Sequence, residues 1–201
     1  MLSFNVMNRF ELKENAKRAL KGKYKDAIII ISLMSLISFA ASFVGAFLGI
    51  FGPIVSIVIN GLAFVGYTSF FLKISRGENP SYKELFERTD LLVPYILISI
   101  LTTVFTLLWS ILFIIPGIIA AISYSMVYYI ALDNPELSAK EAIGKSVEMM
   151  RGYKLEYFML QLSFFGWALL VPFTFGLLSL WLIPYMQVTS ANFYNKLKEI
   201  K

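Results

Sequence analysis

The stretch that decides the fold is "LLWSILFIIPGIIAAISYSMVYY", residues 107–129, in which a Pro-Gly pair interrupts a long apolar run. The run has no Lys, Arg, Asp or Glu from Leu91 to Leu132. One helix of that length would be about 63 Å long at roughly 1.5 Å per residue. The apolar core of a bilayer is only about 30 Å thick. The run therefore predicts two membrane-spanning helices joined by a turn at Pro116 and Gly117.

Two further charge-free runs have the same plan. One covers 27–72, with Gly52 and Pro53 near its centre, and the other covers 157–195, with Pro172 and Gly176 around its midpoint. Together the three runs predict an all-α, polytopic membrane protein with six transmembrane helices in three helical hairpins. The expected spans are 27–50, 54–73, 91–114, 117–132, 156–171 and 175–194. A soluble helical protein is disfavoured, because 58% hydrophobic residues leave too little polar surface to cover a globule of 201 residues.

The charged residues predict the orientation. All 18 Lys and Arg residues and all 13 Asp and Glu residues fall in the segments 1–26, 73–90, 133–156 and 196–201. The three expected hairpin turns carry no charge. Basic residues accumulate on the cytoplasmic side of membrane proteins. We therefore expect both termini and both long loops to lie in the cytoplasm.

The basic cluster before the first span is expected to contact anionic lipid headgroups and not nucleic acid, because it lies next to the membrane. Its members are Lys17, Arg18, Lys21, Lys23 and Lys25. The chain has no Cys and no His, which excludes disulfides, thiolate catalysis and the commonest metal ligands. It has no P-loop, dinucleotide fingerprint or nucleophile elbow. We expect a protein that is not an enzyme and holds no cofactor or metal.

A helix-start signature precedes each expected hairpin. A capping residue followed three places later by Glu forms a box in which the two side chains satisfy free backbone N–H groups. The three boxes are Asn8-x-x-Glu11, Ser81-x-x-Glu84 and Ser138-x-x-Glu141. They predict short amphipathic helices on the cytoplasmic face and one membrane domain, 1–201, built from repeat-like units 8–75, 81–132 and 138–195. Gly22 and Gly152 are expected to end two of these surface helices.

Polar residues inside the expected spans are the candidate site. They are Asn60, Tyr124, Tyr128, Gln161, Gln187 and Asn192, and they could line a polar groove that opens to the cytoplasm. Alternatively, the amides only hydrogen-bond between helices and the tyrosines form an interfacial belt. Pro184 must kink the sixth span, either as plain architecture or as a hinge or cavity wall. No Lys, Arg, Asp or Glu lies within the spans except at the boundary positions Lys73 and Glu156, which disfavours proton-coupled transport.

Small residues form a stripe along the first span. Ala41, Gly45 and Gly49 recur at four-residue spacing and permit close helix approach. The contact lies either within the bundle or between two copies of a homodimer.

Four segments carry a resemblance to a known family. They are "AKRALKGKYKDA", "RGENPSYKELF", the block "FIIPGIIAAISYSMVYYIALDNPELSAKEAIGKSVEMMRGYKLEYFMLQLSFFGW" and the closing "GLLSLWLIPYMQVTSANFYNKL". Over essentially the whole chain the sequence resembles the DUF975 family of bacterial integral membrane proteins. The resemblance implies the bacterial cytoplasmic membrane and no catalytic residues. The general plan is also similar to membrane domains attached to some glycerophosphodiester phosphodiesterases.

Two functions are compatible with these features. The first is a non-enzymatic accessory, regulatory or immunity-type subunit that docks a protein partner. The second is a transporter or a protein that handles a lipid or another amphiphile, including a permease-like partner of an ATPase. A polar cavity that reaches the middle of the membrane would favour the second. A solid bundle with an exposed apolar side face would favour the first, which is the main prediction because the spans contain no residue that could couple transport to an energy source.

Overall fold

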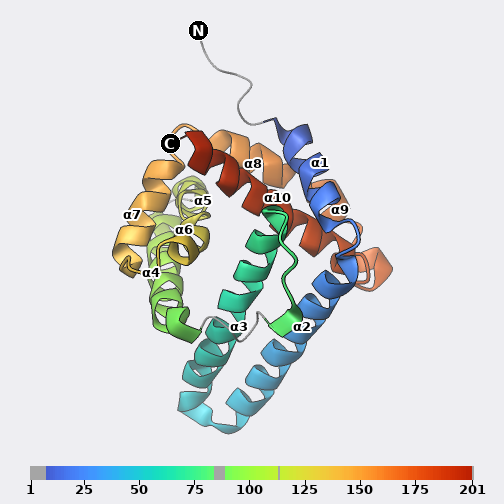
Figure 1. The fold of residues 1–201 in the computed structure, drawn as a ribbon. Helices are drawn as coiled ribbons and strands as arrows, with labels where there is room; N and C mark the ends of the chain where they lie inside the picture. The colour runs from blue at the N-terminus through green and yellow to red at the C-terminus, as the bar shows by residue number, and fades with distance from the viewer. Residues whose placement is uncertain (1–7, 84–88, 113, 201) are drawn as a thin grey trace.

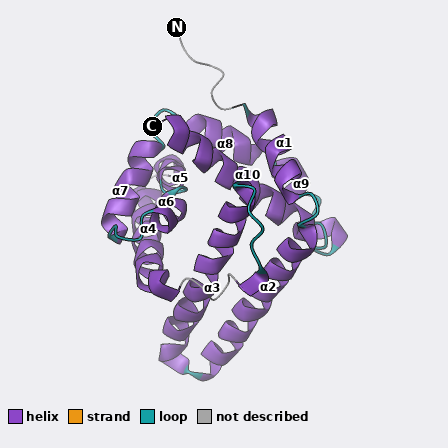
Figure 2. Cartoon of the chain, in the orientation of Figure 1, coloured by secondary structure: helices purple, strands orange, loops and turns teal. Residues whose placement is uncertain are grey.

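The structure is a computed structural model that describes residues 8–83, 89–112 and 114–200. Within these ranges every regular element is a helix and none is a strand (Figure 2). The α-helices are α1 (Arg9–Leu20), α2 (Tyr24–Phe47), α3 (Gly52–Ser75), α4 (Leu92–Leu112), α5 (Ile114–Ser123), α6 (Val127–Asp133), α7 (Ala139–Met149), α8 (Lys154–Leu162), α9 (Phe165–Ala168) and α10 (Ser179–Ile200). The short 3-10 helices are η1 (Gly49–Phe51), η3 (Thr89–Leu91) and η4 (Pro172–Thr174).

Four segments of the described chain are long enough and apolar enough to cross a membrane. They are Tyr24–Phe47, Val55–Ser75, Leu92–Ile111 and Ile114–Asp133. They lie close to the first four expected spans. The count of six spans is not confirmed, because neither half of the third charge-free run forms such a helix.

Helices α2 and α3 lie side by side as a long arm that projects from the rest of the molecule (Figure 1). The chain reverses in η1, where Gly49 has a φ of 53° that favours glycine. Gly52 and Pro53 lie in the first turn of α3 and not in the reversal itself. This corrects the expected turn position. A proline fits the first turn of a helix because a backbone N–H at that position would have no acceptor within the helix.

The small-residue stripe of α2 packs inside this arm. Ala41 and Gly45 are buried, and the hydroxyl of Ser56 on α3 donates to the carbonyl of Ala41 at 3.0 Å. These two small residues therefore serve the contact between α2 and α3.

Helices α4 and α5 form the second close pair. Pro116 and Gly117 lie in the first turn of α5 and not between the helices, for the same reason as Pro53. The expected continuous span 117–132 is interrupted at 124–126, between α5 and α6. The carbonyl of Ser123, at the end of α5, accepts a hydrogen bond at 2.7 Å from the hydroxyl of Ser146, which is fully buried on α7.

Removing the Ser146 hydroxyl is expected to destabilise the fold. The variant Ser146→Ala leaves the buried Ser123 carbonyl without this donor, which costs about 1–2 kcal/mol. Thermal unfolding in detergent would measure the change. Ser42→Ala is the matched control, because Ser42 is exposed and donates only to the Ser38 carbonyl of its own helix. Equal melting temperatures for the two variants would contradict a structural role for Ser146.

The third charge-free run does not form two long spans. The expected fifth span, 156–171, is divided into α8 and the four-residue α9. The expected sixth span, 175–194, begins only at Ser179 and continues to Ile200 through Pro184 as one helix. Its second half contains more polar residues, but most of this half is buried inside the protein, and only the last residues, 198–200, are exposed. Pro172 lies in η4 and Gly176 follows it with a φ of 84°.

Two of the three expected helix starts are found in the structure, at the beginnings of α1 and α7. The Asn8 side chain accepts from the N–H of Phe10, and Ser138 and Glu141 form a complete capping box. Hydrogen bonds from the Ser138 hydroxyl and backbone amide lower the pKa of Glu141. The second box falls partly on Glu84, which lies outside the described residues. Gly22 and Gly152 follow α1 and α7 with positive φ, as expected for helix ends.

Helix α10 joins the two halves of the core. It packs against α1, α2 and α3 and crosses the molecule in front of α8 in Figure 1. Val188 belongs to a buried cluster with Ile30 and Phe70, whereas Ala191 and Phe193 belong to a second cluster with residues of α4, α6 and α7. The segment of α10 between Tyr185 and Asn195 therefore faces the centre of the bundle.

Candidate functional site

Three adjoining cavities meet at Tyr128, and we call them together the Tyr128 chamber. Their volumes are about 480, 240 and 370 Å³. Tyr128 lines all three, and Phe64 lines the first two. Ligand sites in proteins typically measure about 300–1,000 Å³. The first and third of these cavities are therefore each large enough for a small ligand.

The first cavity lies between α2, α3, α4 and α6 and contains Asn60. The Ser38 hydroxyl of α2 donates to the Asn60 carbonyl oxygen at 2.6 Å, and the Asn60 amide donates to the Ser56 carbonyl at 2.8 Å. Asn60 thus links two helices and also lines a space whose other walls are largely apolar. Whether Asn60 also contacts a ligand stays a prediction.

The second cavity lies between α3, α6, α8 and α10 and contains Gln161 and Gln187. The Gln161 amide donates to the Ser190 hydroxyl at 3.1 Å, and the Tyr157 hydroxyl donates to the same oxygen at 3.4 Å. Gln187 hydrogen-bonds the hydroxyl of Tyr67. This is the most polar part of the chamber, because hydroxyl and amide groups converge on it from four helices.

The third cavity lies between α4, α5 and α6. Thr102, Thr103 and Thr106 form its wall on α4, and Tyr124 lies opposite. The interruption between α5 and α6 places Tyr124 and Ser125 on this cavity, because the three residues of the turn leave the helical path.

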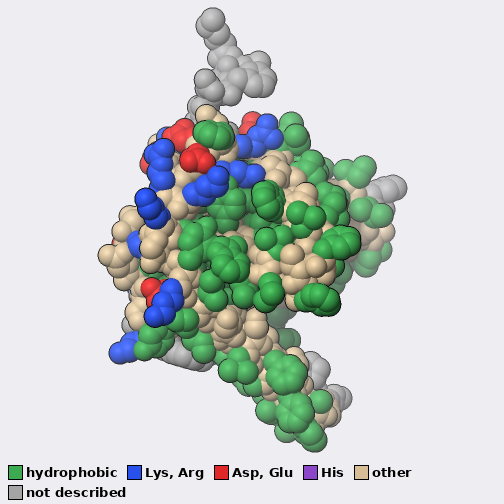
Figure 3. All heavy atoms as spheres, turned by 90° about the vertical axis from the view of Figure 1, so that its right-hand side faces the viewer, with side chains coloured by type: hydrophobic (Ala, Val, Ile, Leu, Met, Phe, Trp, Pro, Cys, Tyr) green, Lys and Arg blue, Asp and Glu red, His purple; other side chains and the backbone are tan. Residues whose placement is uncertain are grey.

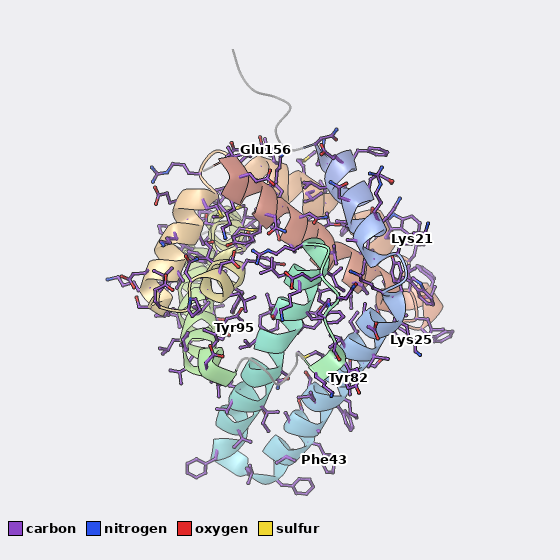
Figure 4. The ribbon with its side chains drawn as sticks, in the orientation of Figure 1. Lys21, Lys25, Phe43, Tyr82, Tyr95 and Glu156 are labelled. Atoms are coloured by element: carbon purple, nitrogen blue, oxygen red, sulfur yellow. The ribbon has the colours of Figure 1, made fainter. Side chains whose placement is uncertain are left out.

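Tyr128 is held firmly where the cavities meet. Its ring lies 5.0 Å from that of Phe64 and 5.2 Å from that of Tyr95, measured between centroids. The hydroxyl of Tyr95 donates to the backbone carbonyl of Tyr128 at 2.9 Å, and the phenol of Tyr128 hydrogen-bonds Ser99 and Thr102. Figure 4 shows Tyr95 on α4, directed toward the interior. This packing leaves the Tyr128 phenol directed to α4, beside the first and third cavities.

The chamber carries no charge among the residues that the structure describes. Its lining consists of apolar, hydroxyl, phenol, amide and thioether side chains and one glycine, without Lys, Arg, Asp or Glu. A ligand with a net charge would lose its hydration there without gaining a counter-ion. The chemistry of the lining fits an uncharged molecule with both apolar and hydrogen-bonding groups.

Asn192 lies apart from the other five candidate residues. It lines a separate polar pocket of about 470 Å³ at the charged face, between α1, α3 and α10. Its amide donates to the carbonyl of Leu12 at 3.3 Å and so ties α10 to α1. The structure thus brings Asn60, Tyr124, Tyr128, Gln161 and Gln187 to the chamber and places Asn192 outside it.

A charged cluster beside this pocket was not foreseen from the sequence. The Asp133 carboxylate accepts two hydrogen bonds from the Arg76 guanidinium, at 2.9 and 2.6 Å. It also accepts from the Tyr194 hydroxyl at 2.9 Å and from the Lys198 ammonium at 2.8 Å. Burial alone would lower the pKa of Arg76, but its contacts with Asp133 outweigh this and raise it. The cluster joins the ends of α3, α6 and α10.

The expected lipid-contacting residues lie at or beside the junction of α1 and α2. Lys21 and Lys25 are exposed there (Figure 4), as are Lys17 and Arg18. Lys23 is partly buried and its ammonium donates to the carbonyl of Glu78. Figure 3 shows basic side chains along one edge of the molecule, whereas hydrophobic side chains cover most of the rest of that face and the projecting arm.

The described residues contain no group of three or more His, Cys, Asp or Glu side chains that could hold a metal ion. Glu156 has one buried carboxylate oxygen without a hydrogen-bond partner in the described part of the chain. Glu156 lies in the first turn of α8, where the helix dipole favours a negative charge.

The comparison with family models gives a match that covers nearly the whole chain. A family model described as "Protein of unknown function (DUF975)" matches residues 7–123 and 111–201. Searches of curated proteins and of solved structures give no match.

Proposed function

The chain belongs to the DUF975 family, and we propose that it is a multi-pass protein of the bacterial cytoplasmic membrane that binds an uncharged amphiphile in the Tyr128 chamber. The family is one of unknown function, so the proposal rests on the geometry and chemistry of the chamber. Four apolar helices of spanning length support the membrane location. The distribution of all 18 basic residues over four segments supports an orientation with both termini in the cytoplasm.

The observation that carries the proposal is the meeting of three uncharged cavities at one phenol. The first cavity is mostly apolar and suits a hydrocarbon chain, with Met34, Ile57 and Ile96 among its walls. The second presents hydroxyl and amide groups and suits a neutral head with hydroxyl or amide functions. Tyr128 borders both, so a single amphiphile would place its head and its chain on opposite sides of this residue.

The amphiphile is proposed to bind without chemical change. The chamber offers hydrogen-bond donors and acceptors but no charged acid or base, so it provides recognition and not acid–base catalysis. Basic residues around Lys21 and Lys25 would contact anionic headgroups outside the chamber, at about 1 kcal/mol each. A protein-docking subunit is the competing proposal, and it needs no internal cavity.

Filling the first cavity is expected to abolish ligand retention. Ser99 lines this cavity on α4, and Ser99→Phe would occupy it with an aromatic ring. After purification in mild detergent, mass spectrometry should find about one amphiphile per wild-type chain and at least about tenfold less in the variant. The control is Ile100→Phe, at a neighbouring position that is 46% exposed on the outside of α4.

The two proposals predict different outcomes. Retention by the wild type and by Ile100→Phe, but not by Ser99→Phe, would support amphiphile binding. A wild-type chain that carries no amphiphile, or equal retention by all three, would overturn it. A stoichiometric protein partner together with an empty chamber would instead support the docking subunit, and an ATPase as that partner would indicate a permease.

A further inference from the structure

Two lysines of the surface helix α1 contact the third charge-free run at both ends of its apolar tip. The Lys13 ammonium lies 3.3 Å from the carbonyl oxygen of Ser163 and 4.1 Å from the ring centroid of Phe164. The Lys17 ammonium lies 5.9 Å from the ring centroid of Tyr185. Burial, with the nearby charges of Lys17 and Arg9, lowers the pKa of Lys13. Helix α1 is held in place by three buried residues on the adjoining face, Leu12, Ala16 and Leu20.

These contacts limit how far the tip enters a membrane. An ammonium group stays at the membrane surface, because its burial in hydrocarbon is costly. Phe164 and Tyr185 must therefore lie near the cytoplasmic interface, and only residues 165–184 lie beyond it. A path of about 20 residues that goes in and returns has about 10 residues in each direction. At roughly 1.5 Å per helical residue each arm covers about 15 Å, half of a core about 30 Å thick.

The tip presents apolar side chains on its outside. Exposed residues include Phe165, Trp167, Leu169, Leu170, Phe173, Phe175, Leu177 and Trp181. Phe175 is 97% exposed and Phe173 is 82% exposed. No charged residue lies near either of them in the sequence. Exposed aromatic clusters of this kind fit hydrocarbon and its interface and not water. Figure 1 shows this tip, α9 and the start of α10, at the right-hand side of the molecule.

The tip also runs beside a spanning helix. Leu180 and Ile183 pack against a buried cluster that includes Ile30 and Ile31 of α2. Those two residues lie about 10 Å along α2 from its start at Tyr24, at the usual helix rise. Helix α2 enters the membrane from the same side as α1, so this neighbourhood places the start of α10 inside the apolar core.

We infer that residues 165–184 form a re-entrant hairpin, which enters the cytoplasmic leaflet beside α2, buries its aromatic tip among the acyl chains of that leaflet and returns to the cytoplasmic side. The chain then crosses the membrane four times and not six. This inference depends on the membrane location proposed above, but not on the amphiphile. The prediction of ligand retention and the prediction of hairpin depth can therefore fail independently.

A nitroxide at the tip would report its depth. The chain has no Cys, so Phe175→Cys can be labelled selectively. In bilayers the label should be accessible to oxygen, which concentrates in lipid, and shielded from a water-soluble nickel complex. Matched positions are Phe51→Cys, at the reversal between α2 and α3, and Tyr82→Cys, in the charged loop (Figure 4). Both of these labels should be accessible to nickel. Phe173→Cys provides a second tip position should the first variant fold poorly.

Each other outcome overturns the inference. If the label at position 175 is accessible to nickel and the cysteine reacts with an impermeant thiol reagent added from outside, the tip crosses the membrane. If it is accessible to nickel only from the cytoplasmic side, the tip lies on the surface.

Discussion

Replacing Gly52 with alanine is expected to lower the melting temperature of the detergent-solubilised protein by roughly 5–10 °C. A Cβ added at Gly52 would lie 2.0 Å from the carbonyl oxygen of Gly45 and 2.7 Å from its carbonyl carbon. Both atoms are backbone, so relief requires α2 and α3 to move apart. Overpacking of this kind costs about 2–3 kcal/mol.

The matched control for Gly52→Ala is Gly144→Ala on α7. A Cβ at Gly144 would meet no atom within 4 Å. Alanine is the better helix former, so this variant should be more stable by about 0.5–1 kcal/mol. The same chemical change is thus expected to have opposite signs at the two sites. A Gly52→Ala variant that melts like the wild type would show that α2 and α3 are not as close as the structure places them.

Replacing Asp133 with alanine should destabilise the protein by about 2–3 kcal/mol. The side chain of Asp133 is only 10% exposed, and it accepts hydrogen bonds from Arg76, Tyr194 and Lys198. Its loss leaves a half-buried guanidinium without its counter-ion and a buried phenol without its acceptor. Thermal unfolding should show the loss, and hydrogen exchange should show increased opening near the end of α10.

The control for Asp133→Ala is Lys198→Ala. The Lys198 side chain is 56% exposed, so its pair with Asp133 is screened by water, and the variant should lose less than about 1 kcal/mol. The double variant Arg76→Ala and Asp133→Ala should be less damaging than the sum of the two single variants, because no unpaired guanidinium remains. Additive losses would show that Arg76 and Asp133 act independently.

Counting charge-free residues predicted the segments that are regular and apolar. Helices α2, α3 and α4 begin and end within a few residues of the expected spans, because charged residues bound each charge-free run at one end and a chain reversal bounds the helix at the other. The turns were misplaced by a few residues, because a proline marks either a break or the first turn of the next helix. Only the hydrogen-bonding pattern around Gly52 and Pro116 separates the two cases.

The third charge-free run could not be assigned from its length alone. A span needs apolar residues along its whole length, whereas α10 carries Gln187, Thr189 and Ser190 in the C-terminal half of the expected sixth span. The contact that limits its depth joins Lys13 to Ser163, 150 positions later in the sequence. No local sequence pattern predicts a contact between two residues that are so far apart in the chain.

The candidate polar residues were found by type but not by arrangement. Tyr128 and Gln161 stood out because uncharged polar groups are rare in apolar helices. Tyr128 borders three cavities because the helix is interrupted between α5 and α6. The interruption falls at residues 124–126, which contain no proline or glycine that would mark it in the sequence. The partners of Asp133 come from two other helices, so the carboxylate looked like an ordinary residue at a helix end.

The orientation in the membrane tests the account most directly, because the proposed location of both termini and the leaflet assigned to the re-entrant hairpin both depend on it. In intact cells, Phe51→Cys should react with an impermeant maleimide, whereas Lys140→Cys on α7 should react only after the cytoplasmic side is opened. Both positions are exposed, so folding should be unaffected. A shielded cysteine at position 51 together with a reactive one at position 140 would contradict the account.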